Sequence, residues 1–280
     1  MYTIFFLLQL IYHVFCIQNL KFNPALVTKN SILRDHDKIF DDYPKPAETK
    51  TTVQLAYVTP WNRRGYSLSV QTAQKLTHIS PVWFQAKPYF ENDKLKSCKI
   101  EGTQDINRDW ITQIRIKNAK IQLVPRIIFE EWSASDMEQL LIKVNVGKRC
   151  FNAISDFYKR NEFDGAVVEL YMQGIISMQS LKAKDLLIES IQDFSKVMKN
   201  LDLTIIFTVP APLDSNNQPN FLLTPSEYKR ILESTDFVQI MTYDYRGTKP
   251  TGVAPYHWIE KCLTYLQSSE QWMQLLPKGI

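Results

Sequence analysis

The chain has 280 residues, of which 45% are apolar, and a formal net charge of +4 at pH 7. This length and composition suffice for one domain with a large buried core. Lysine and arginine are scattered along the chain and form no dense basic stripe, which argues against a nucleic-acid partner.

The chain begins with the apolar run MYTIFFLLQLIYHVFC, residues 1–16. Two polar residues interrupt it and it is short, so we expect no membrane span here. The run and the slim residues before Ile17 are typical of a signal peptide, although no Lys or Arg precedes it; an uncleaved anchor is the alternative. Residues 17–50 are polar, contain several prolines and predict a linker-like arm.

From residue 51 onward, short β-branched or aromatic runs alternate with longer amphipathic runs. The predicted strands are residues 53–60, 78–85, 121–129, 165–172, 204–210 and 237–244. Helical patterns cover residues 106–119, 186–201, 225–232 and 256–267. The third of these begins with a capping box, formed by Thr224, Pro225 and Glu227. The alternation predicts an α/β fold, a TIM-type (β/α)8 barrel over residues 51–280.

A doubly wound sheet is the alternative, but no Gly-rich phosphate turn follows the first strand, where YVTPWNRRG stands. The pattern contains six βα units, and LLPKGI at residues 275–280 resembles only the opening of a seventh strand. We therefore expect a truncated barrel, incomplete at its C-terminal side. Its open strand edges would have to be covered in another way, because unpaired edges invite association.

The cysteines and histidines indicate no metal centre. If Cys16 leaves with the signal peptide, three cysteines remain and allow at most one internal disulfide. Cys150 and Cys262 lie in helical patterns and are expected to be buried, whereas Cys98, in the polar stretch DKLKSCKI, is expected to be the exposed thiol. The four histidines are isolated from one another and from the cysteines, so no metal or other cofactor is expected.

Active sites of such barrels lie at the C-terminal ends of the strands. These ends are rich in aromatic and polar residues: Tyr57, Trp61, Asn62, Trp83, Gln85, Glu130, Glu131, Trp132, Glu169, Tyr171, Met241, Tyr243 and Asp244. Aromatic faces beside carboxylates and amides suit pyranose rings, so sugar is the expected ligand class. Core packing is the alternative for Tyr57, Trp83 and Met241 taken singly, and turn formation for Asp244.

Two of these strand ends resemble the signatures of the family-18 glycoside hydrolases, the chitinases and chitinase-like lectins. The motif FDGAVVELY at residues 163–171 resembles the fourth-strand motif, and MTYD at residues 241–244 resembles the end of the sixth strand. In that register the family's middle Asp falls on Val167, its third Asp on Glu169 and its catalytic Glu on Tyr171. The resemblance implies that the proton donor is missing.

Tyr171 is a poor substitute for that acid, because the unperturbed pKa of tyrosine is about 10. Glu169 should lie on the same face of the strand, but roughly 6–7 Å deeper, which is too far for it to act in place. Three roles remain open for Glu169: a general acid acting on a shifted substrate, a buried carboxylate bonded to Tyr243 or to a ligand amide, or a structural group.

Four stretches resemble a sub-branch of the family more closely, the chitinase domain-containing protein 1 type. They are YVTPWNRRGY (57–66), ISPVWFQ (79–85), VPRIIFEEW (124–132) and FDGAVVELY. This resemblance implies a secreted or lysosomal protein that binds oligosaccharide or polysaccharide, with a scavenger-type receptor as a further partner.

The leading hypothesis is a catalytically inactive chitinase-like protein that binds chitin oligosaccharides or a related glycan. The expected ligand-binding residues are Tyr57, Trp61, Trp83, Glu169, Tyr171, Met241, Tyr243 and Asp244. One alternative is a weak glycoside hydrolase that uses Glu169. The other is a protein-interaction module with a vestigial pocket.

Overall fold

The computed structural model describes residues 28–36, 53–180, 183–245 and 253–268. The expected signal peptide and residues 269–280, whose end resembles the opening of a seventh strand, lie outside the described residues. The chain divides into two units, residues 1–47 and 48–280. In the first unit, α2 (Lys29–Asp35) begins after a capping box between Thr28 and Ser31. The predicted arm at residues 17–50 therefore contains a short helix that the sequence pattern did not predict.

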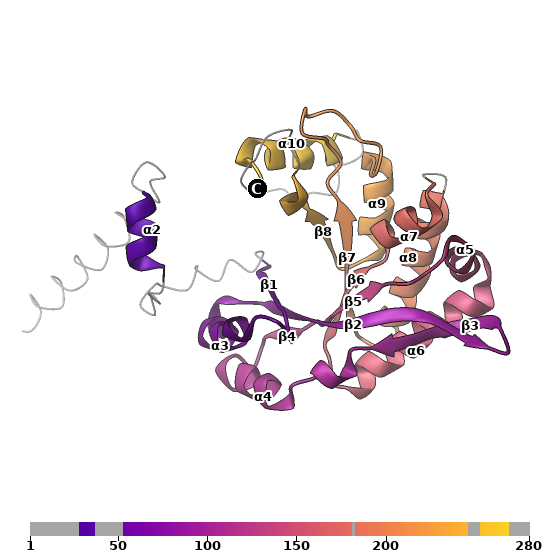
Figure 1. Ribbon diagram of the computed structural model, residues 1–280, viewed down its shortest axis with the longest axis horizontal. Helices are drawn as coiled ribbons and strands as arrows, with labels where there is room; N and C mark the ends of the chain where they lie inside the picture. The colour runs from indigo at the N-terminus through magenta and orange to yellow at the C-terminus, as the bar shows by residue number, and fades with distance from the viewer. Residues whose placement is uncertain (1–27, 37–52, 181–182, 246–252, 269–280) are drawn as a thin grey trace, which may run out of the picture. The chain divides into compact units, whose positions relative to one another are not determined.

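In the second unit, parallel strands pair in the order β1-β2-β5-β6-β7-β8 (Figure 1). Their bounds are β1 Leu55–Val58, β2 His78–Glu91, β5 Arg126–Phe129, β6 Gly165–Glu169, β7 Thr204–Pro210 and β8 Phe237–Met241. A two-residue strand, β4 (Gln122–Leu123), also pairs with β2. Strands that neighbour one another in chain order form the curled sheet of a (β/α)8 barrel. The predicted α/β barrel class is confirmed. All six predicted strands are present, but residues 121–129 form two strands, and the strands predicted at 165–172 and 237–244 end at Glu169 and Met241.

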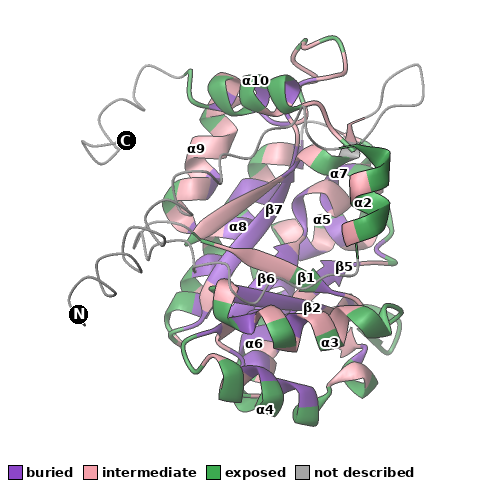
Figure 2. Cartoon of the chain, turned by 90° about the vertical axis from the view of Figure 1, so that its left-hand side faces the viewer, coloured by how far each residue is buried: buried purple, intermediate pink, exposed green. Residues whose placement is uncertain are grey.

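Helices pack around this sheet. They are α3 Arg63–Thr72, α4 Arg108–Lys117, α5 Ala134–Ile142, α6 Val144–Arg160, α7 Tyr171–Met178, α8 Lys184–Lys199, α9 Pro225–Ser234 and α10 Tyr256–Leu266. Short 3-10 turns occur at η2 Ala73–Lys75, η3 Thr103–Asp105 and η5 Thr242–Asp244. Figure 2 shows the strands largely buried, beneath helices whose outer faces are exposed. The α9 capping box is confirmed, because Thr224 and Glu227 each accept the other's backbone N–H.

The sequence reasoning missed a hairpin. β2 continues to Glu91 and returns as the antiparallel strand β3 (Lys94–Glu101). The two residues between them, Asn92 and Asp93, have φ values of 49° and 58°, the left-handed conformation of a tight two-residue hairpin turn. The polar stretch that contains Cys98 is therefore a strand rather than a loop.

This hairpin corrects the prediction for Cys98. Its side chain is only 7% exposed, because it lies on the face of β3 that packs against α6. There it forms a disulfide with Cys150, across a sequence separation of 52 residues. Cys262 is a buried free thiol, as the helical pattern predicted.

Asp164 and Gly165 of the FDGAVVELY motif have structural roles. The Asp164 carboxylate accepts the backbone N–H of Leu123 at 2.7 Å, which joins β6 to the β4 segment. A Cβ on Gly165 would lie 2.1 Å from the carbonyl oxygen of Thr204, so only glycine allows β6 to approach β7 so closely.

The concave face of the sheet is apolar at its N-terminal end. Val124, Val167 and Ile206 form a buried cluster there, with Leu55 and Phe237 packed against it. These five residues come from β1, the β4–β5 segment, β6, β7 and β8, and side chains from so many strands can contact one another only on the concave side of the curled sheet. Val167, at the position of the family's middle Asp, therefore belongs to an apolar layer beneath the strand ends.

Candidate functional site

A pocket of about 630 Å³ opens at the C-terminal ends of three neighbouring strands. Glu169, Pro210 and Met241 are the last residues of β6, β7 and β8, and all three line it. Its other walls come from α7, from the loop between β7 and α9, and from the α10 region: Met172, Gln173, Ile176, Ala211, Leu213, Asp214, Ser215, Asn220, Leu222, Tyr245 and Trp258. Active sites occupy this end of a (β/α)8 barrel.

Glu169, at the inner end of this pocket, is held by an arginine. Nε of Arg126, on the adjacent strand β5, donates to Oε2 of Glu169 at 2.7 Å, and Nη2 donates to the same oxygen. The two side chains are 19% and 18% exposed, so the pair is largely withdrawn from water. This carboxylate accepts charge-assisted hydrogen bonds, whereas a general acid must hold a proton to donate. The arrangement favours an orienting role over an acidic one.

A second polar contact crosses the concave face. The hydroxyl of Tyr57 on β1 donates to Oε1 of Gln239 on β8. The residue as a whole is 39% exposed, but burial of its hydroxyl group, followed by the proximity of Tyr243 and Glu169, raises the pKa of Tyr57, so the phenol stays protonated and acts as a donor. Near Glu169 the strand ends thus carry a neutral phenol donor as well as a carboxylate that is paired with Arg126.

The predicted site residues divide into four groups. Glu169 and Met241 line the pocket. Tyr57, Trp61 and Tyr243 have exposed side chains at strand ends, outside the pocket lining. Asp244 ends the turn η5, but its side chain lies outside what the structure describes.

The remaining two residues, Trp83 and Tyr171, are fully buried. Nε1 of Trp83 donates to the hydroxyl of Tyr66 at 2.7 Å, and its ring meets Trp110 edge-on, between the sheet and helices α3 and α4. Stacking of Trp83 on a sugar was therefore a wrong expectation, because no face of its ring is open to a ligand. The pairing of β2 with β5 shifts register between Val82 and Phe84, so simple alternation could not place this side chain.

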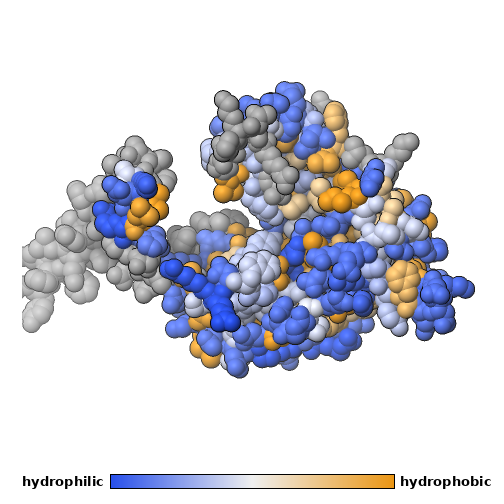
Figure 3. Space-filling model, viewed as in Figure 1, coloured by the Kyte–Doolittle hydropathy of each residue, from blue (hydrophilic) through white to orange (hydrophobic). Residues whose placement is uncertain are grey.

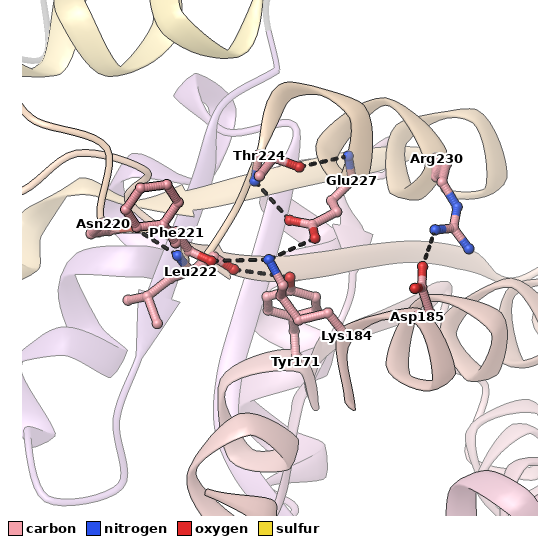
Figure 4. Close-up of polar contacts among 9 residues, drawn as sticks. All are labelled: Tyr171, Lys184, Asp185, Asn220, Phe221, Leu222, Thr224, Glu227 and Arg230. Atoms are coloured by element: carbon pink, nitrogen blue, oxygen red, sulfur yellow. Dashed lines mark hydrogen bonds and ion pairs between the residues drawn. The ribbon is translucent and has the colours of Figure 1, made fainter. Parts of the chain in front are cut away.

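Tyr171, at the position of the catalytic acid, does not face the pocket. It is the first residue of α7, and its hydroxyl donates to the carbonyl oxygen of Leu222 at 3.0 Å (Figure 4). Burial, followed by the nearby carboxylates of Glu227 and Asp185, raises the pKa of Tyr171. The phenol therefore keeps its proton and supports the loop that walls the pocket.

Other polar or aromatic residues near the strand ends serve local structure. Asn62 caps α3 by accepting the N–H of Gly65 at 3.2 Å. Glu131 pairs with Lys87 at 2.5 Å, and Trp132 is buried.

No protein-family model matches the chain. Solved structures of similar fold include a chitinase from Chromobacterium violaceum, with a TM-score of 0.59 and 18% identity over 77% of this chain and 64% of that one. The spore cortex-lytic enzyme SleL of Bacillus megaterium matches with a TM-score of 0.59 and 19% identity, over 77% of this chain and 47% of that one. A mutant GH18 chitinase from Cycas revoluta, in complex with (GlcNAc)4, matches with a TM-score of 0.52 and 12% identity, over 76% and 65%.

This chain shares the α/β barrel fold of these structures. It spans 64%, 47% and 65% of these three structures, so less than two thirds of each. At identities below 20% the similarity concerns the arrangement of strands and helices.

Sequence reasoning missed the residues that complete the pocket. Nε1 of Trp258 donates to the carbonyl oxygen of Asp214 at 2.8 Å, and the ring of Tyr245 meets Trp258 edge-on, with centroids 4.9 Å apart. Asp214 lies in the loop after β7 and Trp258 in α10, whereas Tyr245 directly follows the turn η5. The available signal was the long polar stretch at residues 211–224, because loops at this end of a barrel carry functional residues.

The described part of the chain contains neither a metal-ligating cluster nor a helix that could cross a membrane. No three or more His, Cys, Asp or Glu side chains gather there in a group that could hold a metal ion. None of the helices in those segments combines the length and apolarity needed to cross a membrane. The face seen in Figure 3 is mostly hydrophilic, with hydrophobic residues in small separate groups.

Proposed function

We propose that this chain is a catalytically inactive chitinase-like protein that binds chitin oligosaccharides or a related glycan. The observation that carries the proposal is the placement of Tyr171. The residue in the proton-donor position is fully buried and bonds to the backbone of Leu222 instead of facing the pocket. The chitinase fold, and a neighbour of that fold that binds (GlcNAc)4, support a carbohydrate ligand.

The pocket lining suits a sugar. Tyr245 lines the pocket and supplies aromatic surface for the apolar face of a pyranose ring, whereas Trp258 is only 3% exposed and supports the Tyr245 ring edge-on. Gln173, Asn220 and Glu169 supply groups that bond to hydroxyl or acetamide groups. Arg126 fixes the direction of the Glu169 carboxylate and so orients the ligand through it.

Four of the residues expected from the sequence extend this site outward. Tyr57, Trp61, Tyr243 and Asp244 close strands or follow them at the same end of the sheet. We assign them to further units of a longer oligosaccharide. Met241 belongs to the pocket floor, and Trp83 is excluded by its burial.

We further propose that the protein is secreted or lysosomal and belongs with the family-18 proteins of the chitinase domain-containing protein 1 type. The Cys98–Cys150 disulfide supports an oxidising compartment, as does the apolar run at residues 1–16. A scavenger-type receptor remains a proposed partner, on the strength of the sequence resemblance alone.

The test is calorimetric titration of the purified chain with (GlcNAc)4, with chromatography of the same samples for released sugar. We expect saturable binding without release. Release that is lost in Glu169→Gln but kept in Asp193→Asn, an exposed carboxylate on α8, would support the hydrolase alternative. Receptor binding without any glycan binding would support the interaction module.

A further inference from the structure

Phe221, in the loop between β7 and α9, combines two unfavourable features. Its backbone has a φ of 59°, the left-handed region that glycine and asparagine adopt and that bulky residues avoid. Its side chain is 65% exposed, so the ring gains little from burial. Strained residues of this kind persist only where surrounding contacts impose the conformation, and they cluster at ligand sites.

Side chains from two helices impose this conformation. Nζ of Lys184 on α8 donates to the carbonyl oxygen of Phe221 at 3.0 Å, and the Tyr171 hydroxyl donates to the next carbonyl, that of Leu222, at 3.0 Å. Lys184 is fixed in turn by an ion pair of 2.6 Å with Glu227, in which the two side chains are 14% and 16% exposed. Figure 4 shows these donors converging on the loop from one side, with the Phe221 ring turned away from them.

The strained residue lies at the edge of the proposed sugar pocket. Its two neighbours, Asn220 and Leu222, both line that pocket. Nδ2 of Asn220 donates to the carbonyl oxygen of Ala211 at 2.8 Å and closes the loop across its base. The loop therefore presents an exposed aromatic ring from a rigid support, between two pocket-lining residues.

We infer that Phe221 is a stacking platform for a sugar ring at the rim of the pocket, and that Tyr171 and Lys184 are positioning residues that hold it there. This inference rests on the proposed function and adds a subsite to it. An exposed aromatic ring offers a pyranose the flat apolar face that its axial C–H groups need. The tyrosine in the catalytic position thus serves ligand binding through the loop.

The test compares Phe221→Ala, Phe221→Gly and Phe221→Trp, with affinity for (GlcNAc)4 and the melting temperature as readouts. We expect Phe221→Ala and Phe221→Gly to weaken binding about three- to tenfold, and Phe221→Trp to retain it. Phe221→Gly should also melt at a higher temperature than Phe221→Ala, because glycine adopts a positive φ without strain. Tyr256→Ala is the matched control, since this aromatic is 79% exposed and lies outside the pocket lining.

Tyr171→Phe tests the positioning role, because it removes one hydroxyl and keeps the ring. We expect weaker (GlcNAc)4 binding together with faster amide hydrogen exchange in residues 211–224. Faster exchange without weaker binding would overturn the positioning role.

Different results would contradict the Phe221 subsite and the proposed glycan-binding function. If the wild type binds and the Phe221→Ala and Phe221→Gly variants bind equally well, the subsite is wrong and the proposed function stands. If both variants lose stability along with affinity, Phe221 has a packing role instead. If the wild type binds no chitin oligosaccharide, the proposed function and the subsite are both overturned.

Discussion

The hydroxyl of Tyr57 on β1 donates a hydrogen bond to the side-chain oxygen of Gln239 on β8. These strands are the two ends of the parallel pairing order, and no backbone ladder joins them in the described part of the chain. The bond therefore links the ends of the curled sheet across its concave face.

Removing this link should loosen the sheet ends. We expect Tyr57→Phe to lower the free energy of unfolding by about 1 kcal/mol, because Gln239 is left without its donor. Gln239→Leu should cost a similar amount, and the double variant should cost less than the sum, as measured by urea denaturation. Tyr89→Phe, an exposed tyrosine of the hairpin, is the control. Strictly additive effects would show that the two side chains do not interact.

Breaking the ion pair between Arg126 and Glu169 should lower the stability of the fold, because one charged group is left without its partner. Arg126→Met leaves a carboxylate of low exposure without its partner, and we expect a loss of about 2 kcal/mol after allowance for the remaining contact with water. The double variant Arg126→Met/Glu169→Leu should recover most of this loss, since both charges are gone. Denaturation at pH 7 measures both. A single variant as stable as the wild type would contradict a structural role for the pair.

Restoring the family's acid at position 171 should not restore hydrolysis. In Tyr171→Glu the new carboxylate would be buried near Glu227 and Asp185, away from the pocket. Burial and these neighbours would raise its folded-state pKa above the unfolded value of about 4.3. The variant should therefore lose stability as the pH rises from 4 to 7, and it should release no sugar from (GlcNAc)4. Hydrolysis by this variant would place residue 171 at the pocket after all.

The wild-type tyrosines should make the protein sensitive to alkali. Burial raises the pKa of Tyr57 and Tyr171 above the unfolded value of about 10, so both are neutral in both states below that pH. Above it the unfolded chain loses protons first, and stability falls as the pH rises. Melting curves between pH 9 and 11 should show a smaller fall for Tyr171→Phe than for the wild type. An unchanged slope would mean that Tyr171 titrates normally.

The disulfide should stabilise the hairpin on α6. It closes a loop of 52 residues between Cys98 and Cys150, which corresponds to roughly 4 kcal/mol by chain entropy. Cys98→Ala/Cys150→Ala should lower the melting temperature of the oxidised protein. A reductant should then lower the melting temperature of the wild type and leave that of the variant unchanged. A reductant-insensitive wild type would argue against the bond.

The sequence by itself determined the strand order, the α/β barrel class and the start of α9. These follow from local chemistry, because apolar runs separated by amphipathic ones dictate alternating strands and helices, and Thr224 and Glu227 cap a helix wherever it packs. The FDG motif could be found in the sequence, but the reason for its glycine is tertiary, since Gly165 is required by the close approach of β6 to Thr204 of β7.

Only the tertiary structure decided where the side chains of the site point. β6 ends at Glu169 and α7 begins at Tyr171, so the strand alternation that would have placed both on one face stops between them. Trp83 lies in the core, and the pairing of its strand shifts register at this position. Cys98 can bond to Cys150 because the β2–β3 hairpin packs against α6. The pocket itself is walled by the loop at residues 211–224, whose shape is imposed by donors from other helices. The periodicity of apolar residues predicts which side chains of one strand or helix share a face. These contacts join segments far apart in the sequence, and only tertiary packing brings such segments together.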